Sequence, residues 1–544
     1  MPAHTLVPRS VLFGNPERVA PKISPDGTRL AWIAPHEGVL NVWVRELDGG
    51  EPRVVTGDAE RGVRTFVWAP DDAGILYLQD TGGDENWRVH LTDLASGVTR
   101  DLTPFPQVQA QLLGIDMDVP DRILVGLNRE DPQLHDVYVV DLASGSVQQV
   151  LDNPGFIGMT QDSELVVRAG LAPEPDGGMR LMVRSAEGAA WRELLYIPRE
   201  DALTSQPITF SGDGQRLLMT LSVGANTSRL VWVDVESGEV EVVAADPDYD
   251  VTDVWLQRRT RTPLMVAFQK ERVHWQVLDT SVAEDLAALR ELDSGDLLML
   301  GRDRADQVWI VAFDHADGPG RFYAYHRGSR TADFLFASRP ELDGYQLAPM
   351  EPFSFTARDG LTVHGYLTFP PGTDPKSGPR LPAVLDVHGG PWTRDQWGFD
   401  AEAQWFANRG YVCVQVNYRG STGYGKQFVN AGDREWGAGM HDDLVDAVAW
   451  IIDAGYADPD RVGIYGGSYG GYAALVGAAF TPDLFRCAVD IVGPSNLSTL
   501  IGSIPPYWVP MIAQFHERVG NPETEPDFLW ERSPLSRAGD IRIP

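Results

Sequence analysis

Lysine and cysteine are scarce in this sequence, and long apolar runs are missing. Lysine accounts for only four of the 45 basic residues, at Lys22, Lys270, Lys376 and Lys426. Acidic residues number 77, which gives a formal net charge of −32 at pH 7. An acidic surface of this kind repels nucleic acid and anionic membranes, so neither is expected as a partner.

No run reaches the length of about 18 apolar residues that a membrane-spanning helix needs. The first residues, MPAHTLVPRSVLFG, lack the charged segment and apolar stretch of a secretory signal, so a cytoplasmic location is expected. The two cysteines, Cys413 and Cys487, lie in apolar runs that predict buried strands, where we expect reduced core thiols. The sequence has no CxxC pair and no Cys/His cluster that would indicate a metal site, and no cofactor is expected.

Residues 1–350 contain short β-rich runs separated by turns. Aromatic and β-branched residues dominate runs such as NVWVREL (41–47) and DVYVVDL (136–142), which predicts strands. Hairpin-like turns end in a glycine that recurs at intervals of 47, 48, 43, 50 and 90 residues. These glycines are Gly50, Gly97, Gly145, Gly188, Gly238 and Gly328.

A shared period of this size, with about four strands in each unit, is typical of β-propeller blades. The interval of 90 residues is about two periods, with a weakly marked unit near Ser281, and counting that unit gives seven blades. A set of unrelated β-sandwiches would explain the strands, but it would not explain the period. We therefore expect a seven-bladed β-propeller over residues 1–350.

From Glu351 onward, strand-like runs alternate with helical ones. This alternation predicts a doubly wound, mostly parallel sheet with crossover helices. Examples are the strand-like run YVCVQVN (411–417) and the helical run at 440–455, in which Gly455 follows the last turn as a plausible cap. The expected fold is an N-terminal seven-bladed β-propeller followed by an α/β-hydrolase domain over residues 351–544.

Ser468 is the predicted nucleophile. The sequence GGSYGG (466–471) follows the strand-like run RVGIYG and precedes the helical run YAALVGAAF. A sharp turn from strand to helix projects a serine hydroxyl above the sheet, and the helix N-terminus behind it favours developing negative charge. GxSxG alone is a weak signal, but in this strand–turn–helix context it predicts a hydrolase nucleophile.

Two other loops are expected to lie near Ser468. HGGP (388–391) ends an apolar strand, where α/β-hydrolases place a loop near the oxyanion hole. NYRGSTGYG (417–425) follows another strand, and glycine-rich loops at that edge lie on the site side of an open sheet. Tyr424 on this loop could direct its hydroxyl at an oxyanion, although ordinary loop packing would also explain a tyrosine there.

These segments together resemble the prolyl oligopeptidase family of serine peptidases. HGGP (388–391), NYRGSTGYG (417–425) and GGSYGGY (466–472) occur in the order and spacing of that family. The segments at 357–372 and GDENW (83–87) look like its bacterial acylaminoacyl-peptidase and dipeptidyl-peptidase-like branch. The resemblance covers nearly the whole chain, propeller included.

The resemblance implies peptide hydrolysis by a Ser/His/Asp triad through an acyl-enzyme at Ser468. It also implies an oxyanion hole made by a tyrosine hydroxyl and by the N–H after the nucleophile, roles that fall on Tyr424 and Tyr469. The propeller would restrict substrates to short peptides. The stretch at 496–515 lies where the family builds a substrate wall, so Leu497 and Trp508 are candidate substrate-binding residues, with helix packing as the alternative.

The acid and base of the triad are not found in this sequence. In this fold the order is Ser, then Asp or Glu, then His, and only His516 follows Ser468. His516 lies in a segment that resembles a part of the family without a catalytic histidine. We therefore expect a chain truncated at its C-terminus, with the triad Asp and His beyond Pro544, and inactive as it stands.

Two other functions fit parts of the sequence. An esterase would use the same hydrolase chemistry, and a non-catalytic propeller binding protein would explain the missing Asp and His. Exopeptidase and endopeptidase action both stay open, as does the oligomeric state. Dipeptidyl activity needs acidic groups that hold the free amine of the substrate. Glu85 in GDENW is a candidate for this role, with a solvated loop acid as the alternative.

Overall fold

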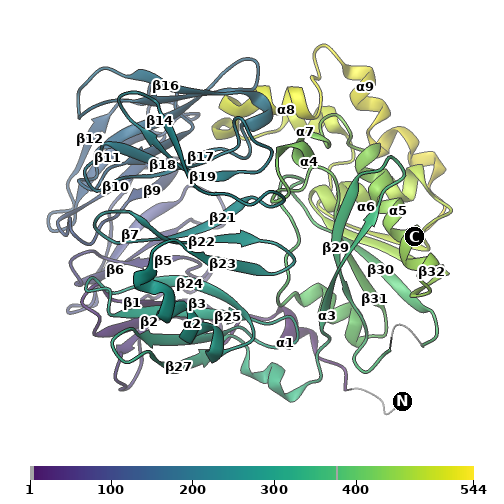
Figure 1. Ribbon diagram of the computed structural model, residues 1–544, viewed down its shortest axis with the longest axis horizontal. Coiled ribbons are helices and arrows are strands. Elements are labelled where there is room, and N and C mark those ends of the chain that lie inside the picture. Colours follow the sequence, from purple (N-terminus) through teal and green to yellow (C-terminus); the bar gives the residue numbers. More distant parts are fainter. Residues whose placement is uncertain (1–4, 375–377) are drawn as a thin grey trace.

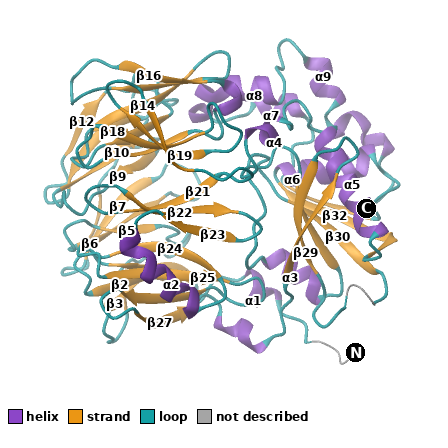
Figure 2. Cartoon of the chain, viewed as in Figure 1, coloured by secondary structure: helices purple, strands orange, loops and turns teal. Residues whose placement is uncertain are grey.

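The computed structural model describes residues 5–374 and 378–544 of the chain. A β-rich half lies beside a half in which helices surround a sheet (Figure 1). Figure 2 shows the same division by secondary structure, with most helices in the second half. Among the described residues, no helix is long and apolar enough to cross a membrane.

The β-rich half is a seven-bladed propeller, and each blade is a sheet of consecutive strands. The first blade contains β1 (Val19–Ile23), β2 (Arg29–His36), β3 (Val39–Glu46) and β4 (Arg53–Val54). The second contains β5 (Phe66–Trp68), β6 (Gly74–Gln79), β7 (Arg88–Asp93) and β8 (Thr99–Asp101). The third contains β9 (Ala110–Gly114), β10 (Arg122–Leu127), β11 (Asp136–Asp141) and β12 (Val147–Leu151).

The remaining blades follow the same plan with one exception. The fourth contains β13 (Gly158–Gln161), β14 (Val167–Pro173), β15 (Met179–Val183) and β16 (Arg192–Ile197). The fifth contains β17 (Gln206–Phe210), β18 (Arg216–Leu221), β19 (Arg229–Asp234) and β20 (Val240–Ala244). The sixth contains β21 (Val251–Leu256), β22 (Pro263–Gln269) and β23 (Val273–Val277), and the seventh contains β24 (Asp296–Arg302), β25 (Val308–Asp314), β26 (Arg321–His326) and β27 (Thr331–Ala337).

The sixth blade explains the weak repeat unit near Ser281. It has three strands, and the helix α2 (Ala283–Leu292) follows them where other blades have a fourth strand. Asp279 accepts a hydrogen bond from the Ser281 N–H and caps the turn that leads into this helix. The seven blades predicted from the turn period are therefore confirmed, and the sixth blade has a helix in place of a fourth strand.

The ring closes through side chains of the first and last blades. Ile23 and Trp32 of the first blade share an apolar cluster with Ile310 of the seventh. The chain enters and leaves the ring at this seam, where the Glu17 N–H donates to the Ser338 carbonyl oxygen at 2.9 Å.

The second half is built on a six-stranded sheet in the order β28-β29-β31-β30-β32-β33. Its strands are β28 (Met350–Thr356), β29 (Thr362–Thr368), β30 (Leu381–Val387), β31 (Val412–Asn417), β32 (Ala457–Gly467) and β33 (Cys487–Ile491). β31, β30, β32 and β33 run parallel, while β28 and β29 pair antiparallel. Every residue of β31 is buried, as expected for an apolar strand covered on both faces.

Crossover helices join the parallel strands and cover the sheet. They include α3 (Ala401–Asn408), α4 (Lys426–Asn430), α5 (Gly439–Asp453) and α6 (Tyr469–Phe480), followed by α7 (Leu497–Gly502), α8 (Ile512–Arg518) and α9 (Pro526–Glu531). Gly455 follows α5 with a φ of 84° and fulfils the predicted capping role. The short N-terminal helix α1 (Arg9–Phe13) packs on α3, where the Phe13 and Trp405 rings lie 5.6 Å apart.

The prediction that both cysteines are buried was wrong for Cys487. Cys413 is buried in the central strand β31, whereas Cys487 is exposed on β33. β33 is the outer strand of the sheet, so its side chains lack the cover that central strands receive, and Val489 and Ile491 are also 46% and 43% exposed. The Ala488 N–H of this edge donates to the Pro544 carbonyl oxygen at 3.0 Å.

Candidate active site

Ser468 occupies a strained turn between β32 and α6. Its φ and ψ are 56° and −116°, a conformation that costs on the order of 1–3 kcal/mol for a residue other than glycine. The surrounding backbone holds it there, because the Ser468 N–H donates to the Ile491 carbonyl oxygen at 2.9 Å and the Ser468 carbonyl accepts from the Tyr472 N–H at 3.0 Å. This is the sharp elbow that the GxSxG motif predicts.

The glycines around Ser468 allow segments of the backbone to lie in contact. A Cβ atom on Gly470 would lie 1.9 Å from the Val387 carbonyl oxygen, and one on Gly466 would lie 2.5 Å from the Gly470 carbonyl carbon. Both distances are far below a van der Waals contact. The motif therefore needs glycine at these positions for packing as well as for the turn.

The loop after β30 lies against the nucleophile. A Cβ atom built on Gly389 would be 3.4 Å from the Ser468 Cβ and 4.0 Å from its Oγ. The structure therefore brings together the HGGP and GGSYGG segments, which are about 80 residues apart in the sequence. A backbone N–H group at this position can donate a hydrogen bond to an oxygen that develops negative charge beside Ser468.

His388 supports this loop and has partners other than Ser468. Its Nδ1 lies 2.8 Å from the Gly389 carbonyl oxygen, its Nε2 lies 3.1 Å from the Ser421 Oγ, and its ring stacks on Tyr418 at 4.4 Å. Burial lowers the pKa of His388 to about 4, so the ring is neutral near pH 7. His388 fixes the two glycine-rich loops to each other.

Tyr469 begins α6 directly after the nucleophile. The first N–H groups of an α-helix have no acceptor within the helix, and the helix dipole favours an anion there. The Tyr469 side chain is buried and packs edge-on against Trp436 at 4.6 Å. The Tyr469 N–H thus lies at the start of the helix that follows Ser468, and its oxyanion role stays a prediction.

The Tyr424 side chain is buried between its own loop and β29. Its hydroxyl oxygen accepts from Asn417 Nδ2 at 2.8 Å, and its ring stacks on His364 of β29 at 4.7 Å. In the sheet order, β29 is separated from β32 by β31 and β30, and neighbouring strands lie about 5 Å apart. None of the contacts described for Tyr424 is with Ser468. Burial raises the pKa of the Tyr424 hydroxyl well above its usual range.

The propeller holds the Tyr424 loop directly. The Asp250 carboxylate accepts from the Gly423 and Gly425 N–H groups, each at 3.1 Å, and from the Ser228 N–H at 2.6 Å. Lys426 Nζ also pairs with Asp201 at 2.6 Å. The loop is therefore fixed between the domains.

The two predicted wall residues have different surroundings. Trp508 is 43% exposed and stacks on Phe515 at 6.1 Å, and Phe515 in turn packs edge-on against Trp392 at 5.6 Å. Leu497 has no exposed surface and packs in the hydrolase core, where its N–H donates to Ser533 Oγ at 3.0 Å. Trp508 can meet a substrate, and Leu497 supports α7 from within.

Trp392 is a candidate site residue that the sequence did not single out, and Tyr507, within the predicted wall at 496–515, makes a contact that was not predicted. Trp392 directly follows the HGGP segment, and this position in the motif was the signal that could have identified it. The Tyr507 hydroxyl donates to Glu85 Oε2 of the propeller at 2.9 Å, a contact that no local pattern predicts. Glu85 itself has a φ of 57°, so its carboxylate is presented from a strained loop.

No histidine hydrogen-bonds Ser468 within residues 5–374 and 378–544. His441 is buried in α5, with its Nε2 3.0 Å from the Thr481 Oγ1. His516 lies in α8, whose side chains contact the propeller through Gln514. The same described ranges contain no group of His, Cys, Asp and Glu that could hold a metal ion.

Comparison with known proteins gives the same assignment as the geometry. The family model described as the prolyl oligopeptidase family matches residues 397–543. The chain is 44% identical to dipeptidyl aminopeptidase BIII of Pseudoxanthomonas mexicana over 547 residues, which cover 99% of this chain and 79% of that protein. It is 34% identical to dipeptidyl peptidase family member 6 of Caenorhabditis elegans, over 99% of this chain and 78% of that protein.

Solved structures share the fold at low sequence identity. A puromycin-hydrolyzing peptidase of Mycobacterium tuberculosis superposes with a TM-score of 0.78 at 19% identity, covering 99% of this chain and 87% of that one. A puromycin hydrolase superposes with a TM-score of 0.75, also at 19% identity, covering 98% of this chain and 86% of that one. With its propeller, its strained serine elbow and these relatives, the chain belongs to the prolyl oligopeptidase family of serine peptidases.

Proposed function

We propose that this protein releases dipeptides from the amino ends of short peptides through an acyl-enzyme at Ser468. The observation that carries the proposal is the position of Ser468, strained at the start of α6 and in contact with the Gly389 loop. The release of dipeptides is suggested by the two relatives described above, both of which are named as dipeptidyl peptidases.

In the proposed reaction, the Ser468 hydroxyl attacks the carbonyl carbon of the peptide bond and forms a C–O bond. The Tyr469 N–H stabilises the resulting oxyanion, and collapse of this intermediate breaks the C–N bond and releases the amine. Water then hydrolyses the acyl-enzyme. The resemblance also assigns an oxyanion donor to the Tyr424 hydroxyl, and that assignment stays a prediction.

A base must take the Ser468 proton and return it to the leaving amine. Because no described histidine reaches Ser468, and because the base follows the nucleophile in this fold, we propose that the acid and base lie beyond residue 544. The 544-residue chain alone would then hydrolyse peptides more slowly than a longer form, by up to roughly 10⁶-fold.

A dipeptidyl peptidase must recognise a free amino group. Glu85 is the proposed partner of that ammonium group, because its carboxylate lies where the propeller meets the hydrolase domain, next to Tyr507. We also propose that residues 1–350 restrict access and that residues 351–544 carry the chemistry, with α1 packed on the second domain.

A fluorophosphonate probe tests the nucleophile in a form of the protein that continues beyond residue 544. The probe should label the parent protein, and Ser468→Ala should abolish labelling. Ser503→Ala, an exposed serine at the end of α7, is the matched control and should be labelled like the parent. Labelling that survives Ser468→Ala would reject the assignment.

A further inference from the structure

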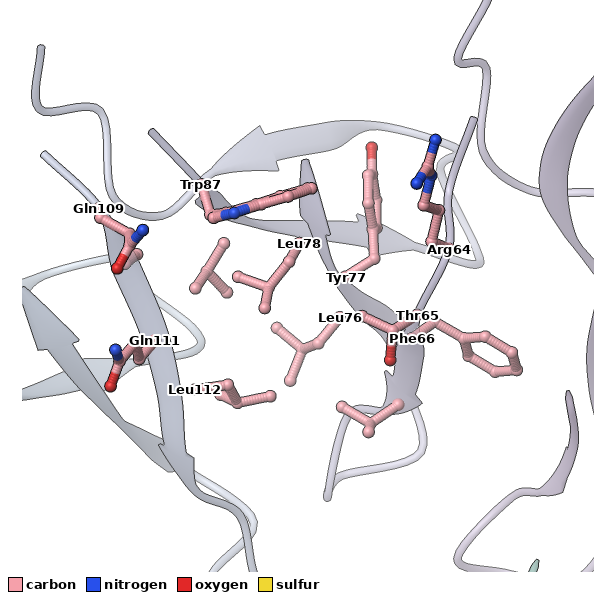
Figure 3. Close-up of a pocket in the computed structure, with 13 residues that line it drawn as sticks. Arg64, Thr65, Phe66, Leu76, Tyr77, Leu78, Trp87, Gln109, Gln111 and Leu112 are labelled. Carbon is pink, nitrogen blue, oxygen red and sulfur yellow. The ribbon is translucent and has the colours of Figure 1, made fainter. Parts of the chain in front are cut away.

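A cavity of about 550 Å³ lies between the second and third blades. Figure 3 shows that Leu76, Leu78 and Leu112 extend into this space, with the Trp87 ring beside Leu78. Leu76 is fully buried and closes the inner end, whereas Leu78, Trp87 and Leu112 are half-buried. The cavity is therefore an open, apolar recess in the packing of two blades.

One end of the cavity, at Trp87 and Gln109, lies on the side of the propeller that faces the hydrolase domain. Trp87 ends the loop that carries Glu85, and Glu85 accepts the hydrogen bond of Tyr507 at 2.9 Å. Gln109, at the rim, donates from Nε2 to the Glu85 carbonyl oxygen at 3.2 Å. A charged group held by Glu85 would therefore lie at the opening of the recess.

Aromatic side chains connect this opening with the nucleophile. Trp392 follows the Gly389 loop, which contacts Ser468, and packs against Phe515 at 5.6 Å. Phe515 stacks on Trp508, whose ring lies 6.5 Å from that of Tyr507. These contacts form a series of packed aromatic rings from the Gly389 loop to Tyr507, the residue that hydrogen-bonds Glu85.

Another space between blades contains ion pairs as well as apolar side chains. The cavity between the sixth and seventh blades, of about 460 Å³, contains the Arg272–Asp296 pair at 2.7 Å. His315 and Asp293 approach each other there at 2.8 Å. Trp275, Leu286 and Leu297 also line that space, whereas no ion pair is formed among the described residues that line the recess between the second and third blades.

We infer that this recess binds the apolar or aromatic side chain of the first residue of the substrate, while Glu85 holds that residue's ammonium group. The inference rests on the proposed function, which requires a free amino terminus. The volume of the recess lies in the range of about 300–1,000 Å³ that is typical of ligand pockets. An apolar lining with a polar rim is also typical of such pockets. The enzyme would thus prefer peptides that begin with a large apolar residue.

Peptide binding to the Ser468→Ala protein tests the inference without turnover. In calorimetry, Phe-Ala-Ala should bind at least about tenfold more tightly than Ala-Ala-Ala, because the recess buries the benzyl group. Leu112→Trp fills the recess and should abolish the preference while leaving the affinity for Ala-Ala-Ala within about twofold. Val98→Trp adds the same ring at a 56% exposed position of the second blade and should leave the preference intact.

Trp87→Ala provides a second variant in case Leu112→Trp does not fold, and it should also reduce the preference to less than about threefold. Equal affinities for the two peptides in the parent would overturn the inference, as would a preference that survives Trp87→Ala. A form that continues beyond residue 544, has Ser468 intact and shows the preference but hydrolyses no peptide would contradict the proposed function instead. Hydrolysis of both peptides without the preference would contradict the recess alone.

Discussion

The role of the Tyr424 hydroxyl can be tested separately from the role of the Tyr424 ring. The ring packs on His364 and Arg394 at 4.7 Å and 4.2 Å, while the hydroxyl oxygen accepts from Asn417 Nδ2. If the hydroxyl donated to the oxyanion, its loss would lower kcat by about 10²–10³. In the structure the hydroxyl is bonded to Asn417 at the base of the loop, and its oxyanion role stays a prediction.

We expect Tyr424→Phe to lower kcat by less than about tenfold, because the ring contacts remain and only the bond to Asn417 is lost. Steady-state kinetics on a form that carries the complete triad would measure this. A loss of 10²–10³ in kcat with an unchanged KM would give Tyr424 the oxyanion role after all.

His441 should contribute to the pH dependence of stability. Burial lowers its pKa to about 4, whereas an unfolded histidine titrates near about 6.5. Between these values the unfolded state binds more protons than the native state, so the contribution of His441 to stability is full above about pH 6.5 and is lost toward pH 4. We expect His441→Gln to make the unfolding midpoint of the hydrolase domain less dependent on pH in this window. Parallel pH profiles for the parent and the variant would contradict the assignment.

At the scale of single elements, Asp250 fixes the loop that leads into α4. Asp250→Ala would leave the N–H groups of Ser228, Gly423 and Gly425 without their acceptor, and each unsatisfied buried group costs about 1–3 kcal/mol. We expect a lower Tm and a lower kcat/KM in this variant. Asp248→Ala changes an exposed acid two residues earlier and is the control, with an expected Tm close to that of the parent. An unchanged Tm in Asp250→Ala would show that the loop does not depend on this carboxylate.

The sequence predicted those elements whose signals are local. Gly97, Gly145 and Gly238 have φ values of 71°, 74° and 75°, so hairpin turns that require glycine marked the blades. The sixth blade was weakly marked because α2 replaces a strand, and a helix carries no turn of that type. Ser468 was predictable because strand, turn and helix adjoin in the sequence.

The rest of the site depends on contacts between distant segments. Glu85 and Tyr507 are more than 400 residues apart, and no periodicity encodes their hydrogen bond. The direction of the Tyr424 side chain follows from Asn417 and from the propeller around it, which local sequence does not contain. Leu497 was expected at a substrate wall, but α7 turns that face into the core.

For the whole molecule, the outer strand β33 presents an exposed apolar edge. Val489 and Ile491 are 46% and 43% exposed on it, and such edges pair with other chains. We expect the 544-residue chain to self-associate, and we expect Val489→Lys to reduce this association because a lysine on an edge opposes pairing. Light scattering at increasing protein concentration would measure the effect. A parent chain that stays monomeric would contradict the prediction.

The seam of the propeller has a consequence for how such a molecule can be assembled from parts. The segment that enters the ring at Glu17 is hydrogen-bonded to the segment that leaves it at Ser338, and α1 on one side and β28 on the other both belong with the hydrolase domain. The propeller is thus a cassette inserted into one chain at neighbouring points. Exchange of this one contiguous segment could replace the propeller by another one without cutting a strand of the catalytic sheet, so substrate selectivity and catalytic chemistry could evolve separately.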